Sequence, residues 1–228
     1  VLENFYDQDC SEIKIDLDIR LTPSKNAQKY YHEYKKSVTA EKKLAEQIKL
    51  GEDELAYIES VFDSLTRARS DIDVIELRME LAEQGYIRTS RLKGKPPKEQ
   101  PPLKFRSSDG FLISVGKNNK QNDKLTLKTA GKNDLWFHTH DITGSHVILF
   151  TEGNEPSDKA VREAAMLAAY HSKGRNSSQV PVDYTQARYV KKPAGAKPGM
   201  VIFTNNLTVY VKPDEETINS MREGNKNA

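Results

Sequence analysis

Residues 134–149 hold the chain's only tryptophan, Trp136, and three of its five histidines. Trp136, His138 and His140 are spaced two residues apart, so on a β-strand their side chains point to one face. His146 follows after a turn signal and lies within reach of that face. An aromatic ring and imidazoles gathered in this way can stack on nucleic-acid bases, bind a metal ion, or seal a core around a buried hydrogen bond.

A metal site would need two or three of these imidazoles and a further fixed ligand, for which Asp141 is the nearby carboxylate. No cysteine lies near, because the only one is Cys10. We therefore predict no metal ion and no other cofactor. Two interpretations stay open: a buried structural role for Trp136 with one histidine, and a surface that stacks on RNA bases.

Positive charge gathers in residues 173–200, where six cations face a single acid, Asp183. Cations that meet phosphates beside aromatic faces are typical of proteins that hold single-stranded or looped RNA. The alternative is a solvated charged face without a ligand. The predicted RNA-binding residues are Trp136, His138, His140, His146, Lys173, Arg175, Arg188, Lys191, Lys192 and Lys197.

Catalytic motifs are missing from the sequence. Ser145 and His146 are neighbours, so strand geometry points their side chains to opposite faces. There is no glycine-rich phosphate loop before a helix and no Gly-x-Ser-x-Gly elbow. We predict that the chain is not an enzyme.

The composition is that of a polar chain of 228 residues, with 36% hydrophobic and 30% charged residues. Its apolar runs are too short for membrane insertion. A single cysteine excludes a disulfide framework and favours a reducing, cytoplasmic setting. The sequence begins without methionine, so we expect a piece of a longer protein.

The net charge of +2 hides an asymmetry. Residues 1–90 carry 13 Lys and Arg against 19 Asp and Glu, a net charge of −6. Residues 91–228 carry 22 against 14, a net charge of +8. The difference predicts two surfaces with different partners.

The N-terminal half first alternates apolar and polar residues over residues 12–20, which predicts a strand with one buried face. From Ser24 the apolar residues follow alternating four- and three-residue steps, the pattern of a coiled coil. Gly51, followed by two acids, predicts a turn between two antiparallel helices. Asp71 is expected to cap a third helix. The apolar seam could pair within one chain or between chains, so the oligomeric state stays open.

The C-terminal half begins after a proline-rich stretch, residues 93–102, which predicts a linker. Asp109-Gly110 then predicts a hairpin, Asn122 a helix cap, and Ser157 the cap of a helix over residues 158–172. The fold class expected is α+β: an antiparallel helical coiled-coil hairpin, then a mostly antiparallel sheet of five or six strands with one main packed helix.

Several motifs, taken in order, resemble the C-terminal half of the NFACT family, ribosome-associated quality-control factors whose Gram-positive members are often called fibronectin-binding proteins. The motifs are residues 21–27, 122–128, 134–149, 189–193 and 195–202. Two departures are Thr143, where the family motif has proline, and His140, where lysine is common.

The resemblance implies four parts. Residues 1–23 would be a strand remnant of an N-terminal domain absent from this chain, and residues 24–90 a coiled-coil arm. Residues 91–102 would be the linker, and residues 103–228 the family's RNA-binding domain.

The function implied is that of a non-catalytic binding factor. It would bind stalled large ribosomal subunits, through rRNA and ribosomal protein, and tRNA, and so support C-terminal alanine tailing of nascent chains. The rival interpretation is a fibronectin-binding adhesin, which would place the protein at the cell surface without a signal peptide.

Overall fold

The structure is a computed structural model that describes residues 1–88 and 99–222. The chain forms two compact units, Val1–Glu52 and Asp53–Ala228. Among the described residues, no helix combines the length and apolar character that crossing a membrane requires.

The first unit contains little sheet. β1 (Leu2–Glu3) pairs antiparallel with β2 (Glu12–Ile13), and the apolar side chains from Ile13 to Ile19 are all exposed. The strand expected over residues 12–20 is therefore wrong beyond its first residues. The backbone there bonds to the following helix instead, since Asp18 donates its N–H to Asn26 Oδ1 at 2.8 Å.

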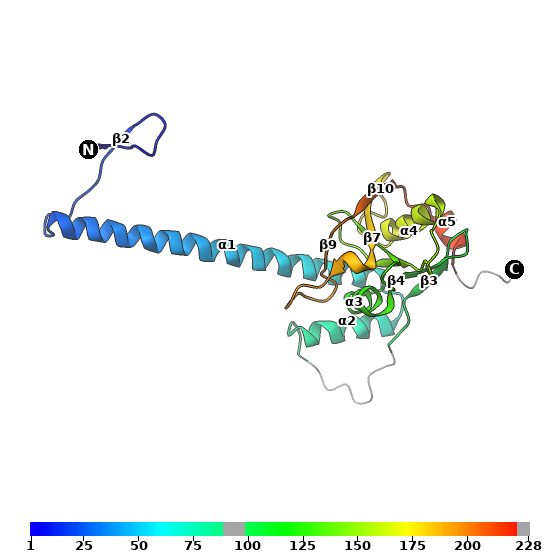
Figure 1. Cartoon of the computed structure of the whole chain (residues 1–228). Helices are drawn as coiled ribbons and strands as arrows, with labels where there is room; N and C mark the ends of the chain where they lie inside the picture. Colours follow the sequence, from blue (N-terminus) through cyan, green and yellow to red (C-terminus); the bar gives the residue numbers. More distant parts are fainter. Residues whose placement is uncertain (89–98, 223–228) are drawn as a thin grey trace. The chain divides into compact units, whose positions relative to one another are not determined.

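The predicted turn at Gly51 is also wrong, because α1 (Pro23–Arg67) runs through it as one helix (Figure 1). One glycine costs a helix only about 1 kcal/mol relative to alanine. Good helix formers surround it, and no proline lies between Pro23 and Pro96. The predicted seam of the first unit, from Tyr31 to Ile48, is exposed within that unit.

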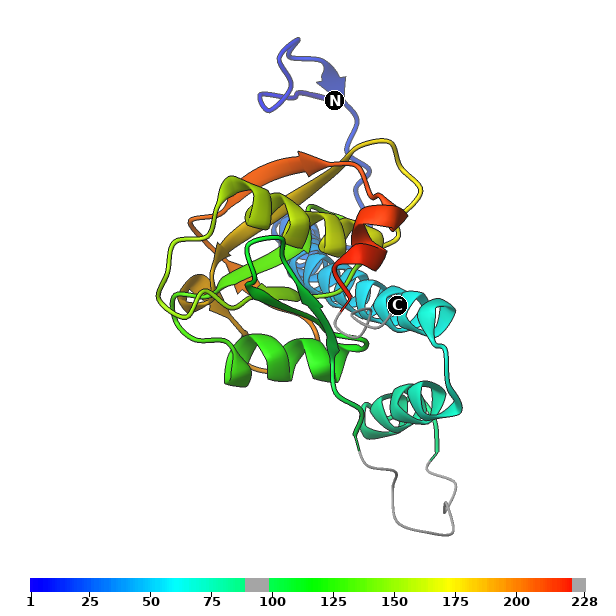
Figure 2. The same ribbon diagram turned by 90° about the vertical axis from the view of Figure 1, so that its right-hand side faces the viewer.

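The second unit is built on a six-stranded antiparallel sheet, which confirms the α+β fold class. α4 (Asp158–Tyr170) lies across one face, with α5 (Glu215–Ser220) beside it (Figure 2). Ser157 caps α4 as predicted, accepting the N–H of Ala160 at 3.2 Å. In spatial order the strands are β10 (Leu207–Val211), β7 (Val180–Gln186), β5 (Leu135–Thr139), β6 (Val147–Leu149), β4 (Leu112–Val115) and β3 (Leu103–Arg106).

The opposite face of the sheet is also covered. α3 (Asn119–Lys124) and the π-helical turn η1 (Leu125–Thr129) pack there, together with a two-stranded ribbon. The ribbon follows the short turn η2 (Ala187–Tyr189) and pairs β8 (Val190–Lys191) with β9 (Ile202–Phe203). The N-cap of α3 is Asn118, so the predicted capping role of Asn122 is wrong.

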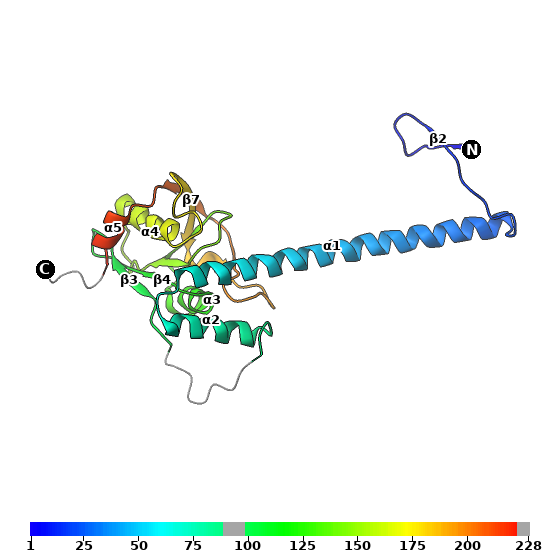
Figure 3. The ribbon, with the colours of Figure 1, turned by 180° about the vertical axis from the view of Figure 1, so that it is seen from behind.

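An antiparallel helical pair does exist, at a different turn. The chain reverses after Arg67, and α2 (Asp71–Glu83) begins at a capping box formed by Ser70 and Asp73. The cap is therefore Ser70 and not Asp71. α3 lies beside both helices (Figure 3), and Asn119 donates to Ser60 at 2.8 Å and to Glu80 at 3.0 Å. Hydrogen bonds between buried polar side chains therefore join the helices, because buried polar atoms need hydrogen-bond partners.

Most of the expected linker, residues 91–98, lies outside the described residues. Its last part is bound to helices, since Gln100 donates its N–H to Glu76 at 2.7 Å and accepts from Gln121 at 3.1 Å. By contacts, residues 53–88 belong to the same unit as the sheet.

Candidate nucleic-acid interface

Trp136 occupies the middle of the sheet face opposite α4. β5 lies between β7 and β6, so both neighbours pair with it, and the indole is fully buried. It packs against Leu125, Ile148 and Val190, and its ring centroid lies 4.8 Å from that of Phe203 in the ribbon. An indole in this position is part of the core and is closed to an incoming base.

The two histidines nearest Trp136 complete a ring cluster. His138 stacks on the indole with centroids 5.8 Å apart, and His146 lies edge-on to both rings, at 5.3 and 5.5 Å. Burial lowers the pKa of both imidazoles, and the mutual repulsion of the two lowers that of His146 further. Both are therefore neutral near pH 7, and only His138 keeps partial exposure.

Hydrogen bonds fix His146 in its buried position. Its Nδ1 lies 2.8 Å from Thr126 Oγ1, and its backbone N–H donates to Asn122 Oδ1 at 3.1 Å. The sequence interpretation missed these partners, although Asn122 lies in a motif that it had singled out. A Cβ at Gly116 would lie 2.1 Å from Asn122 Oδ1, so this contact requires glycine there.

His140 is separate from that cluster. It is exposed, and its Nδ1 lies 2.6 Å from Asp183 Oδ2, while Thr208 donates to the other carboxylate oxygen at 2.6 Å. The hydrogen bond that His140 donates to Asp183 raises the pKa of His140. Across residues 1–88 and 99–222, no three His, Cys, Asp or Glu side chains form a group able to hold a metal ion.

Three of the six predicted cations are paired with acids. Lys173 reaches Glu59 at 2.9 Å, Arg175 reaches the buried Asp63 at 3.2 Å, and Lys192 bonds to Asp123. Such pairs cancel much of the charge that a phosphate would meet. They join the end of α1 to the segment that follows α4, and α3 to the segment that follows β8.

The other three cations are not paired with acids among the described residues. Lys191 is exposed on β8, Arg188 hydrogen-bonds the neutral amide of Asn133, and Lys197 lies over the rings of Tyr86 and Tyr57, at 4.8 and 5.6 Å. Among the described residues, these three form no ion pair. The ribbon and the segments flanking it therefore carry the uncompensated positive charge of the predicted set.

Arg67 is a further residue that the sequence interpretation did not consider. It binds Asp63 at 2.9 Å and donates to Ser145 Oγ at 2.9 Å, next to His146. Ser145 in turn donates to the Gly116 carbonyl at 2.7 Å. This chain connects the end of α1 to the tryptophan motif across 78 residues of sequence, so no local pattern could have indicated it.

Comparison with known proteins gives the family. Residues 1–100 match the NFACT N-terminal and middle domains, and residues 102–205 match the NFACT protein RNA binding domain. Curated proteins named "Rqc2 homolog RqcH" are 43% identical over 96% of this chain in Bacillus subtilis and 44% identical over 97% in Streptococcus suis. The chain spans about 39% of the length of each.

A solved structure is also similar. It is the C-terminal part of the fibronectin/fibrinogen-binding protein from Streptococcus suis, with a TM-score of 0.82 and 44% sequence identity. The match covers 89% of this chain and 81% of that one.

Proposed function

Because this chain belongs to the NFACT family, we propose that it acts as an RNA-binding factor in ribosome-associated quality control. The longer protein would bind a large ribosomal subunit blocked by peptidyl-tRNA and contact rRNA, ribosomal protein and tRNA. It would thereby support addition of a C-terminal alanine tail to the nascent chain. The ribosome would form the peptide bonds, so the role proposed is binding without catalysis, in the cytoplasm.

The observation that carries the proposal is the match of residues 102–205 to the family's RNA-binding domain. The charge distribution supports it, because Arg188, Lys191 and Lys197 keep uncompensated charge around one ribbon. Cations without acidic partners can meet phosphates without first breaking an ion pair. The buried Trp136 favours phosphate contacts over base stacking as the source of affinity.

Lys191→Glu tests the proposal, since this side chain is exposed. Binding of the chain to purified large subunits and to tRNA would be measured at increasing salt. We expect weaker binding and a shallower salt dependence, because each phosphate contact contributes about −0.7 to −0.9 to the slope of log K against log salt. Lys159→Glu on α4, on the other side of the sheet, is the matched control.

Equal losses for the two variants, or an affinity that does not change with salt, would refute a phosphate-binding role for the ribbon. Unchanged binding of Lys191→Glu at low salt would do the same.

A second candidate is fibronectin binding, favoured by the name of the similar Streptococcus suis protein. The exposed segment from Ile13 to Ile19 could add a strand to a partner. Ile15→Lys combined with Leu17→Lys should then abolish binding of immobilised fibronectin by the whole chain. Fibronectin binding without any binding of large subunits would favour adhesion over the first proposal.

A further inference from the structure

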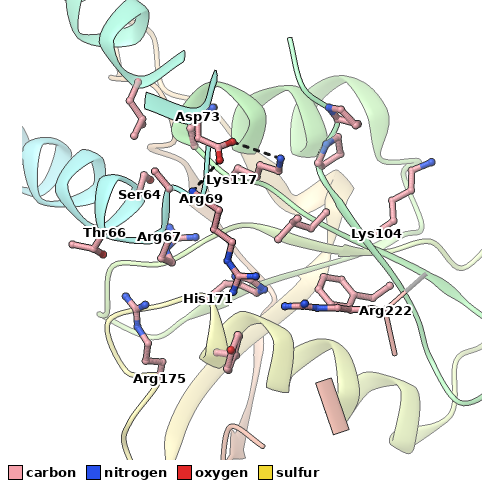
Figure 4. Close-up of a pocket in the computed structure, with 18 residues that line it drawn as sticks. Ser64, Thr66, Arg67, Arg69, Asp73, Lys104, Lys117, His171, Arg175 and Arg222 are labelled. Carbon is pink, nitrogen blue, oxygen red and sulfur yellow. Dashed lines mark hydrogen bonds and ion pairs between the residues drawn. The ribbon is translucent and has the colours of Figure 1, made fainter. Parts of the chain in front are cut away.

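A cavity of about 710 Å³ lies within the second unit, apart from the ribbon. It is enclosed by the turn between α1 and α2, by β3, and by the end of α4 (Figure 4). Of the ten residues predicted from the sequence, only Arg175 lines it. Its size falls within the range of roughly 300–1,000 Å³ that small-molecule sites occupy.

The lining is strongly cationic. It contains one acid, Asp73, and six cations: Arg67, Arg69, Lys104, Lys117, Arg175 and Arg222. Asp63, behind the wall, is shared by two of them, and Lys117 lies 3.6 Å from Asp73. Counting both acids leaves a surplus of four positive charges.

Three of these four charges belong to side chains that have no acidic partner in the described part of the chain, and the fourth arises because Arg67 and Arg175 share Asp63. Within residues 1–88 and 99–222, the side chains of Arg69, Lys104 and Arg222 form no ion pair. Arg69 and Arg222 converge near His171, whereas the amino group of Lys104 points away (Figure 4). Two guanidinium groups brought together repel each other unless an anion lies between them.

His171 supplies a buried polar atom at the same place. The residue is 7% exposed, and its Nε2 has no hydrogen-bond partner among the described residues. Its ring packs against Phe105 and Tyr170, with centroids 6.1 and 5.2 Å away. Burial, and then the charges of the surrounding arginines, lower the pKa of His171 to about 3, so the ring is neutral. A ligand in the cavity would give this nitrogen the hydrogen-bond partner that buried polar atoms normally have.

Part of the remaining wall is apolar. Leu77 of α2, Pro101, Pro102 and Leu103 face the cavity beside Phe105. A ligand that satisfies both walls must join an anionic group to a flat or apolar one. Nucleotides have this chemistry, because the phosphate suits guanidinium groups and the base suits aromatic and apolar side chains.

We propose that this cavity binds a nucleotide through its phosphate, with Arg69, Arg222 and His171 meeting phosphate oxygens and the apolar wall receiving the base. The site is distinct from the ribbon proposed above to meet RNA. A free nucleotide and the phosphorylated end of an RNA present the same group. The test therefore includes both sources.

Calorimetric titration of the whole chain would compare AMP with adenosine, and a 5′-phosphorylated RNA hexamer with its 5′-hydroxyl form. The phosphorylated member of at least one pair should bind tighter, and inorganic phosphate should compete with it. Preference within the AMP pair identifies a free nucleotide as the ligand. Preference confined to the hexamer pair identifies an RNA end.

Arg69→Ala combined with Arg222→Ala should remove that preference and weaken binding about tenfold or more, since each charge-assisted hydrogen bond is worth at least that factor. Arg78→Ala combined with Arg162→Ala removes the same charge from exposed positions outside the cavity and should leave binding unchanged. His171→Phe retains the ring packing and should also weaken binding, with the melting temperature as a check on folding.

The proposal is overturned if both members of each pair bind equally, or if the control pair of substitutions lowers affinity as much. RNA binding that is lost in Lys191→Glu, while the cavity variant keeps both the wild-type affinity and the wild-type preference for the phosphorylated ligand, would also remove this site. That outcome would leave the proposed RNA-binding function intact.

Discussion

Trp136→Ala should destabilise the second unit by about 3–5 kcal/mol, the range for removing a large aromatic side chain from a core. The indole is fully buried and packs against rings of His138, His146 and Phe203. The lost contacts come from three different segments, so the cavity cannot close by a shift of one of them. For a unit of this size, about 1 kcal/mol lowers the melting temperature by roughly 2–4 °C, so the expected fall is about 10 °C.

Circular dichroism is the appropriate assay, because the substitution removes the chain's only indole fluorophore. Trp136→Phe keeps a ring in the core and should cost less than Trp136→Ala. Tyr210→Ala, at a side chain that is 59% exposed, should change the free energy of unfolding by no more than about 0.5 kcal/mol. An unchanged melting temperature together with lost RNA binding would refute the core role and make Trp136 a stacking platform.

Three further predictions concern stability. Asp63→Ala should lower the free energy of unfolding by about 3 kcal/mol in urea titrations, because it leaves the largely buried Arg67 without its carboxylate. Stability should decline as pH falls below about 6.5, because His138, His146 and His171 have lowered pKa values when folded, so the unfolded chain binds more protons. A urea midpoint that stays constant from pH 7 to pH 5 would contradict this. Gly51→Ala should raise helicity and stabilise α1 by about 1 kcal/mol, whereas a turn at Gly51 would make the same change destabilising.

The sheet could be predicted from the sequence because its signals are local. Asp109-Gly110 joins β3 to β4, and Gly110 adopts the positive φ of 89° that the turn requires. Ser157 begins α4 by a side-chain cap within three residues. Alternation along β5 correctly placed Trp136 and His138 on one face, but it could not indicate that the ribbon β8–β9 covers that face.

The packing of the helices was harder to predict, because the apolar heptad residues and the residues that pack lie on different faces of α1. Leu55, Ile58, Phe62 and Leu65 follow the heptad steps, yet all four are exposed. The face that packs is Tyr57, Val61 and Ser64, with Asp63 beside it. That face is partly polar, so the pattern of apolar residues did not indicate that it packs. Its partners come from distant parts of the chain: Glu80 bonds to Tyr57 and Arg175 to Asp63.

Tertiary contacts likewise explain why the sequence could not indicate which of the predicted cations lie beside an acid. Lys173, Arg175 and Lys192 look equivalent to Lys191 in the sequence, but each is opposed by an acid from another element. Conversely, Arg69 and His171 were not among the residues that the sequence predicted to bind a ligand. The fold brings both to one cavity with Arg222. The positive charge available to a ligand therefore depends on which cations the fold pairs with acids. This pairing can be known only from the tertiary structure, because the two partners are distant in the sequence.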